Sequence, residues 1–114
     1  MTTTIRVTGI EAEGRHGVRA QEREALQRFV VDLELTVEPT ADRLDATADY
    51  RGAIATARET VAGDSVELLE TLADRVAAAV GALPGVLFCR AVVHKVDAAA
   101  RLDVGDISAE DTDG

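Results

Sequence analysis

The sequence predicts an α+β domain in which an antiparallel sheet carries two helices on one face. Segments with alternating apolar residues lie toward both ends of the 114-residue chain, and segments with helical spacing lie between them. In the clearest alternating segment, residues 29–38, one face is apolar and the other carries Asp32, Glu34, Thr36 and Glu38. This pattern is typical of an antiparallel sheet that is covered on one side. The expected order is therefore strand, strand, helix, helix, strand, strand (ββααββ).

The strands are predicted from period-two alternation. In chain order, their expected ranges are 4–12, 29–38, 86–95 and 102–107. A turn over 14–17 and a loop or short helical turn over 18–26 separate the first two strands. On the third strand, one apolar face is expected to carry Leu87, Cys89, Ala91 and Val93. Lys95 continues this face by one step. We expect a single domain over 1–110, with an acidic tail over 111–114.

Two helices are predicted between the second and third strands. Asp49 can cap a helix that begins near Tyr50 and stops at Gly63. Residues 64–67 resemble a capping box and predict the start of a second helix. The apolar stripe of this second helix follows at helical spacing and consists of Leu69, Leu72, Val76, Val80 and Leu83.

Composition narrows the classes of function. The net charge of −9 argues against nucleic acid and anionic membranes as partners. No apolar run approaches the roughly 20 residues of a membrane span, and residues 1–4 lead directly into a strand pattern rather than a signal peptide. The single cysteine, Cys89, cannot form an intramolecular disulfide, which fits the reducing cytoplasm. The two histidines lie in no metal-ligand pattern, so no metal site is expected.

Lys95 and Glu70 are candidate functional residues. Lys95 is the only lysine, since the other eleven basic residues are arginine. An amine can release a proton where a guanidinium cannot, although a lysine at a strand end can simply extend into water. Glu70 lies beside the apolar stripe of the second helix, where its carboxylate could bind a planar pair of N–H donors. The alternative is a solvated helix acid. Glu22 is indistinguishable from its charged neighbours, and Tyr50 is the only tyrosine.

Four segments together resemble the dihydroneopterin aldolase family. They are Gly14-Arg15-His16-Gly17 with Glu22 and residues 27–33, Asp45 to Tyr50, the Leu-Leu-Glu-Thr-Leu-Ala run over 68–73, and His94-Lys95. The resemblance implies a tunnelling-type fold, in which four subunits close their sheets into a barrel and two such rings commonly form an octamer. It also implies active sites between subunits, retro-aldol cleavage of 7,8-dihydroneopterin, and no cofactor, metal or enzyme Schiff base.

The resemblance also implies roles for individual residues. Glu70 would bind the 2-amino and N3 hydrogens of the pterin, and the backbone near Leu69 and Ala48 would hold the ring. Lys95 and Glu22 would lie at the hydroxylated side chain, and Tyr50 of a neighbouring subunit would supply or relay a proton. The loop after Lys95 departs from the family pattern, because it lacks the usual proline.

Two alternatives remain beside the aldolase. One is an epimerase of dihydroneopterin or of its triphosphate. A triphosphate would require added basic residues near the side-chain end, and an acidic chain offers few. The other is a non-catalytic pterin-binding assembly protein, which predicts loss of some of the four residues Glu22, Tyr50, Glu70 and Lys95, yet all are present.

Overall fold

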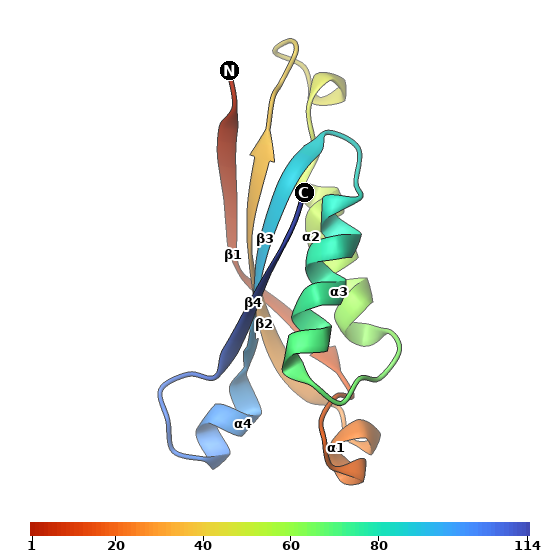
Figure 1. The fold of residues 1–114 in the computed structure, drawn as a ribbon, viewed down its shortest axis with the longest axis vertical. Helices are drawn as coiled ribbons and strands as arrows, with labels where there is room; N and C mark the ends of the chain where they lie inside the picture. Colours follow the sequence, from red (N-terminus) through yellow and green to blue (C-terminus); the bar gives the residue numbers. More distant parts are fainter.

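The computed structural model describes all 114 residues and contains one antiparallel sheet in the order β1-β2-β3-β4 (Figure 1). The strands are β1 (Thr3–Gly14), β2 (Gln27–Val37), β3 (Val86–Lys95) and β4 (Ser108–Asp113). The helices are α1 (Ala20–Glu24), α2 (Tyr50–Ala62), α3 (Leu69–Gly81) and α4 (Val96–Arg101), with a 3₁₀ turn at Leu44–Ala46. Helices α2 and α3 lie together on one face of the sheet. The predicted α+β class and the ββααββ order of the main elements are confirmed.

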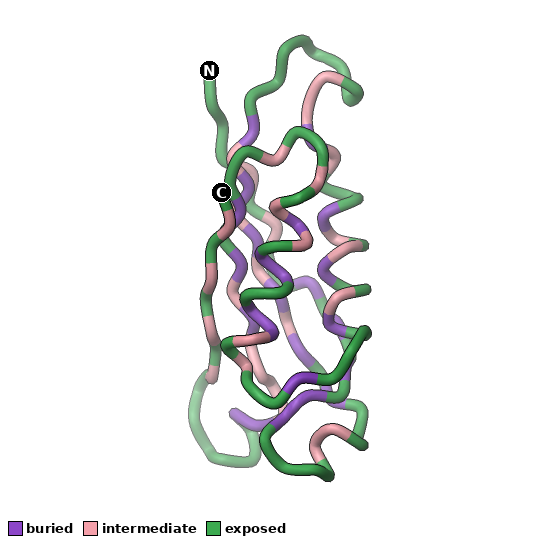
Figure 2. Tube along the Cα trace, turned by 45° about the vertical axis from the view of Figure 1, so that its right-hand side comes forward, coloured by how far each residue is buried: buried purple, intermediate pink, exposed green.

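The core lies between the sheet and the two long helices, where the buried segments face one another (Figure 2). Along β2, the odd-numbered residues from Phe29 to Val37 are all buried, and the even-numbered ones are not. A one-residue slip of β2 would expose its whole apolar face, so burial fixes the pairing register. Leu72 and Val76 of α3 complete the core from the helix side. None of the helices combines the length and the apolar character that crossing a bilayer requires.

The first long helix follows its local sequence, whereas the second begins later than expected. The Asp49 side chain accepts a hydrogen bond from the Arg51 N–H at 3.0 Å, and Gly63 caps the other end of α2. In contrast, the prediction that residues 64–67 start a helix is wrong, because α3 begins at Leu69. Ser65 instead donates its hydroxyl to the Arg15 carbonyl, and Val66 is buried. These tertiary contacts override the local capping signal.

Two further expectations about strands are corrected. Leu87 is exposed, because the β2–β3 register shifts at this position and Val37 pairs with Val86. The last strand is not at 102–107 but at 108–113, where it pairs with residues 89–94 of β3. The acidic tail expected over 111–114 is therefore part of β4 through Asp113. A short, acidic edge strand has little sequence signal of its own, and charge on an edge discourages pairing with other chains.

His16 connects three segments, a structural role that the Gly14-Arg15-His16-Gly17 motif did not predict. The residue is 2% exposed, and its ring packs edge-on against Phe29 at 5.5 Å between centroids. Nε2 lies 2.6 Å from the Val61 carbonyl, and Nδ1 accepts the Val66 N–H at 3.1 Å. The ring must be neutral to make both bonds. Burial lowers the pKa of His16, the hydrogen bond to Val61 opposes this shift, and the positive charges of Arg75 and Lys95 add to it.

Replacing this ring should destabilise the fold in a pH-dependent way. His16→Leu leaves a buried carbonyl and a buried N–H without partners, which we expect to cost about 1–3 kcal/mol near pH 7.5. The unfolded chain binds a proton at His16 near pH 6.5 and the folded chain only at lower pH. The neutral ring therefore contributes its full stability above pH 6.5 and less as the pH falls. Urea unfolding at matched protein concentration should show a smaller difference between wild type and variant at pH 5.5.

His94→Gln is a control of opposite sign. Burial lowers the pKa of His94, but hydrogen bonds to Asp32 and Asp106 outweigh it and raise the pKa overall. Because the folded state binds this proton more tightly, the stability lost in His94→Gln should grow on acidification. A His16→Leu difference that stays constant or widens at pH 5.5 would contradict the neutral-ring assignment.

Candidate functional site

Glu22 lies on α1, a five-residue helix between β1 and β2. Such a short helix is not stable by itself, and here side chains fasten it to the sheet end. The buried amide of Gln27 donates to the backbone carbonyls of Glu22 at 2.6 Å and of His16 at 2.8 Å. Arg23 donates to the Gly17 carbonyl at 2.9 Å. These bonds fix α1, and with it the direction of the Glu22 side chain.

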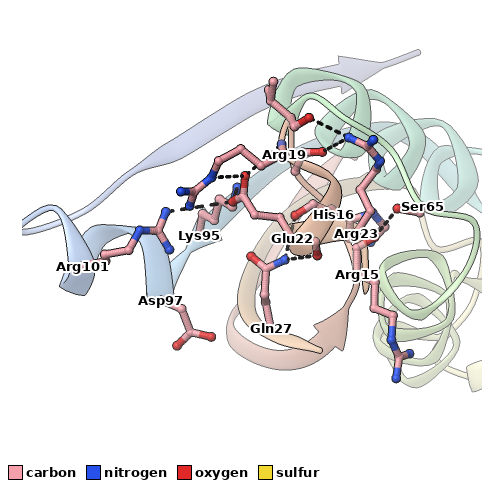
Figure 3. Close-up of polar contacts among 12 residues, drawn as sticks. Arg15, His16, Arg19, Glu22, Arg23, Gln27, Ser65, Lys95, Asp97 and Arg101 are labelled. Carbon is pink, nitrogen blue, oxygen red and sulfur yellow. Dashed lines mark hydrogen bonds and ion pairs between the residues drawn. The ribbon is translucent and has the colours of Figure 1, made fainter. Parts of the chain in front are cut away.

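Lys95 reaches Glu22 because of the register of the sheet. Lys95 is the last residue of β3 and pairs with Phe29 near the start of β2, next to α1. Its Nζ lies 2.8 Å from Oε2 of Glu22 (Figure 3). The side chains of Lys95 and Glu22 are only 16% and 11% exposed. The alternative of a lysine that simply extends into water is therefore wrong.

The Glu22 carboxylate is held in its ionised form. The Lys95 hydrogen bond lowers the pKa of Glu22 to about 2, although burial acts in the opposite direction. The Arg19 backbone N–H contributes at 3.3 Å, and the Arg19 Nε lies 3.4 Å from the same Oε1 atom. The site thus contains an amine and a carboxylate whose charges are mutually stabilised.

Glu22 and Lys95 line a cleft together with Leu69 and Glu70 of the first turn of α3. The cleft has a volume of about 750 Å³. Glu70 is exposed and has no hydrogen bond or ion pair within the chain, so its carboxylate is free to bind a ligand. Four of the six predicted site residues therefore meet in one place. A hollow of similar size, about 740 Å³, lies near the junction of β1, β2 and α2 and is lined by none of the six.

Tyr50 and Ala48 lie at the other end of the molecule. Tyr50 begins α2, and the opposite end of this 13-residue helix contacts His16 through Val61. Val61 is 11 residues after Tyr50, and at about 1.5 Å per residue this separates Tyr50 from the His16 end by about 17 Å. Ala48 lies against Gly85, just before β3 begins, whereas Lys95 is at the end of that strand. The half-exposed Tyr50 side chain does not line the cleft of its own chain.

The wall of the cleft opposite α3 comes from the segment that follows Lys95. Residues 96–101 form α4, which Arg28 anchors through two guanidinium nitrogens 3.1 Å from Oδ1 of Asp97. The next loop is held by His94, whose ring lies 2.9 Å from Oδ2 of Asp106 and 2.7 Å from Oδ2 of Asp32. The segment that departs from the family pattern is thus ordered by its own ion pairs.

Two arginines of the cleft were missed by sequence reasoning. Arg19 precedes α1, and Arg101 ends α4 with its NH2 atom 4.0 Å from Oε2 of Glu22. Nothing in the local sequence distinguishes them from the other arginines. Their placement depends on α1 and α4, and α4 was not predicted.

The architecture is that of a tunnelling-type protein with an acid–amine cleft at one end of its sheet. The family model that matches residues 5–111 is described as dihydroneopterin aldolase. Two curated dihydroneopterin aldolases are similar in sequence. That of Streptomyces coelicolor is 35% identical over 108 residues, 91% of each chain, and that of Bacillus subtilis is 37% identical over 98 residues, 82% of each chain. The chain belongs to the dihydroneopterin aldolase family.

Solved structures share the fold. The Escherichia coli dihydroneopterin aldolase in complex with neopterin superposes with a TM-score of 0.86 at 21% identity, covering 98% of this chain and 99% of that one. A Burkholderia dihydroneopterin aldolase bound to guanine has a TM-score of 0.79 at 25% identity, covering 98% and 90%. The tunnelling-type fold expected from the resemblance is confirmed.

The ion pair predicts an abnormal titration of Glu22. With a pKa of about 2, its carboxyl should remain ionised from pH 6 down to pH 3.5. Lys95→Met removes the principal cause of the shift and should bring the titration into this range. Carbon-13 NMR of the Glu22 side-chain carboxyl, followed as a function of pH, measures this titration in the wild type and in the variant. A wild-type midpoint near the ordinary value of 4.5, or a Lys95→Met variant that still shows no titration, would contradict the pairing.

Proposed function

We propose that the protein cleaves 7,8-dihydroneopterin by a retro-aldol reaction into 6-hydroxymethyl-7,8-dihydropterin and glycolaldehyde, a step of folate synthesis. One observation carries the proposal. In a member of this family, the only lysine lies 2.8 Å from an ionised carboxylate in a cleft that also holds a second, unpaired carboxylate. The pair provides proton-transfer groups, and the unpaired acid provides a ring-binding group.

Glu70 is proposed to recognise the pterin ring. The 2-amino group and the N3 hydrogen of a pterin form a planar donor pair, and two carboxylate oxygens match it. Guanine presents the same pair, an amino group beside a ring N–H, and a Burkholderia relative is described as bound to guanine. The backbone at Leu69, next to Glu70 in the cleft, and that of Ala48 from a neighbouring subunit would hold the ring.

Lys95 and Glu22 are proposed to act on the side chain of the substrate. Lys95 assists removal of the proton from the 2′-hydroxyl through a water molecule, while Glu22 holds the amine in position. The C1′–C2′ bond then breaks, C2′ becomes the aldehyde carbon of glycolaldehyde, and the electron pair passes into the conjugated imine protonated at N5. Tyr50 supplies or relays the proton that C1′ takes up. Because the ring accepts the electrons, the mechanism requires neither a metal nor an enzyme Schiff base.

The proposed site is completed by a second copy of the chain. Tyr50 and Ala48 lie at one end of the molecule and the Glu22–Lys95 pair at the other, so one subunit cannot bring them together. The sheet also has two edge strands, β1 and β4, with no partner on their outer sides. Edges of this kind are removed when sheets close into a barrel. We therefore propose a ring of four subunits, alone or stacked as an octamer, acting in the cytoplasm.

Epimerisation at C2′ is a compatible second activity. If the bound glycolaldehyde rotates to present its other face before the C1′–C2′ bond forms again, the same residues would invert the configuration at C2′. A binding-only role fits less well, because Glu22 and Lys95 form a largely buried ion pair that recognition of the ring does not need.

The Lys95→Arg variant distinguishes a catalytic role of the titratable amine from a role of its positive charge. Wild-type protein incubated with 7,8-dihydroneopterin should release glycolaldehyde, measured as a reduced or derivatised aldehyde. The variant keeps a cation but loses the titratable amine, so its kcat should fall by about 10²–10⁴-fold. Binding of neopterin should change only a few-fold, because Glu70 is untouched.

The outcomes distinguish the alternatives. Full turnover by Lys95→Arg would remove Lys95 from the mechanism. Tight neopterin binding by wild type without glycolaldehyde release would replace the aldolase with the binding-protein alternative. Arg75→Lys, a matched change on the exposed part of α3, should leave turnover unchanged.

A further inference from the structure

The end of the cleft at Glu22 has a local excess of positive charge, in a chain whose net charge is −9. Three cations surround the single carboxylate of Glu22 (Figure 3). The distances to its oxygens are 2.8 Å from Lys95 Nζ, 3.4 Å from Arg19 Nε and 4.0 Å from Arg101 NH2. With Glu22 ionised, the balance of this group of four side chains is +2.

The other three acids that line the cleft, Glu67, Glu70 and Glu110, differ in whether a nearby cation already pairs with them. Glu67 has Arg23 at 3.8 Å, and Glu110 shares Arg90, at 2.7 Å, with Glu34, so each already faces a cation. Glu70 is the one unpaired acid, and the proposed function assigns it to the ring. The three cations around Glu22 therefore form a positive subsite where the side chain of the substrate would lie.

Arg19 and Arg101 have nitrogen donors to spare. Their side chains are 54% and 47% exposed, and both line the cleft. Arg19 uses only Nε on Glu22, and Arg101 makes no hydrogen bond. A guanidinium offers a planar fork of donors that matches the oxygens of a phosphate better than an ammonium does.

We propose that this subsite accepts a phosphate monoester at the 3′-oxygen of the dihydroneopterin side chain, an inference that rests on the proposed function. Lys95 and Glu22 act at C2′, and C3′ is the next carbon, so a 3′-phosphate lies beside Arg19 and Arg101. A monoester carries a charge of about −1.5 to −2 near pH 7, which the local +2 neutralises. The negative charge of a triphosphate would exceed this local charge of +2. The two arginines match the charge of a monoester, and they remain few for a triphosphate, as the sequence predicts.

The chemistry of cleavage is unchanged by the phosphate. The proton leaves the 2′-hydroxyl, the C1′–C2′ bond breaks, and its electron pair enters the ring system as before. The phosphate ester bond stays intact on C3′. The products are 6-hydroxymethyl-7,8-dihydropterin and glycolaldehyde phosphate, and no oxidant, reductant or water is consumed.

The test compares kcat/KM for 7,8-dihydroneopterin 3′-monophosphate with that for 7,8-dihydroneopterin, following glycolaldehyde phosphate and glycolaldehyde separately. Wild type should cleave the monophosphate at least as efficiently. The double variant Arg19→Gln/Arg101→Gln should lower the ratio of the two kcat/KM values by about tenfold or more, as expected for lost charge-assisted hydrogen bonds. Arg75→Gln, which removes an arginine outside the cleft, should leave the ratio unchanged.

A binding measurement keeps the test independent of variant folding. By calorimetry, wild type should bind neopterin 3′-monophosphate more tightly than neopterin, and the difference should shrink as salt is raised. This inference would be overturned if the protein cleaves dihydroneopterin but does not cleave the monophosphate, or does not bind neopterin monophosphate more tightly than neopterin. The aldolase proposal would remain intact. An unchanged ratio in the double variant would also overturn this inference. Cleavage of neither compound would overturn the proposed function itself.

Discussion

The β2–β3 register determines the positions of both the core residues and the charged residues of the cleft. The odd-numbered residues of β2 and the facing residues of β3 fill the same core, so a slip by one position would expose both sets. This register places Lys95 opposite Phe29, at the sheet end from which α1 projects. The ion pair with Glu22 follows, because α1 immediately precedes β2. A packing requirement in the core thus positions the polar groups of the cleft.

Around this end of the sheet, buried polar contacts replace the rigidity that short elements lack. His16 joins the turn after β1 to α2 and to the α2–α3 linker, and Gln27 joins that turn to α1. On the other side, the Arg28–Asp97 ion pair fixes α4. Side-chain contacts therefore hold the α1 and α4 walls of the cleft, and the contact at α4 joins residues distant in sequence. Such a scaffold presents charged side chains in a defined geometry before a ligand arrives.

Local signals in the sequence predicted the elements that depend on local forces. Alternation along 29–38 and the Asp49 cap correctly indicated β2 and α2. The failures arise where tertiary contacts dominate: Ser65 and Val66 are drawn to the turn near His16, and β4 is a polar edge strand defined by its pairing with β3. The site divides in the same way. Lys95 was conspicuous as the only lysine, but Glu22 was identified only through family resemblance, and Arg19 and Arg101 carried no local signal.

We propose that one active site requires both ends of the chain, the Glu22–Lys95 end of one copy and the Tyr50 end of another. Mixing two variant subunits measures whether active sites form between copies. Lys95→Arg and Tyr50→Phe proteins, each impaired alone, are unfolded together in equal amounts, refolded and assayed for glycolaldehyde release from 7,8-dihydroneopterin. If each site takes one residue from each neighbour, random assembly restores about one quarter of the sites to wild type, and activity returns to that level. A mixture no more active than the average of the two variants would show that the two residues act within one chain or not at all.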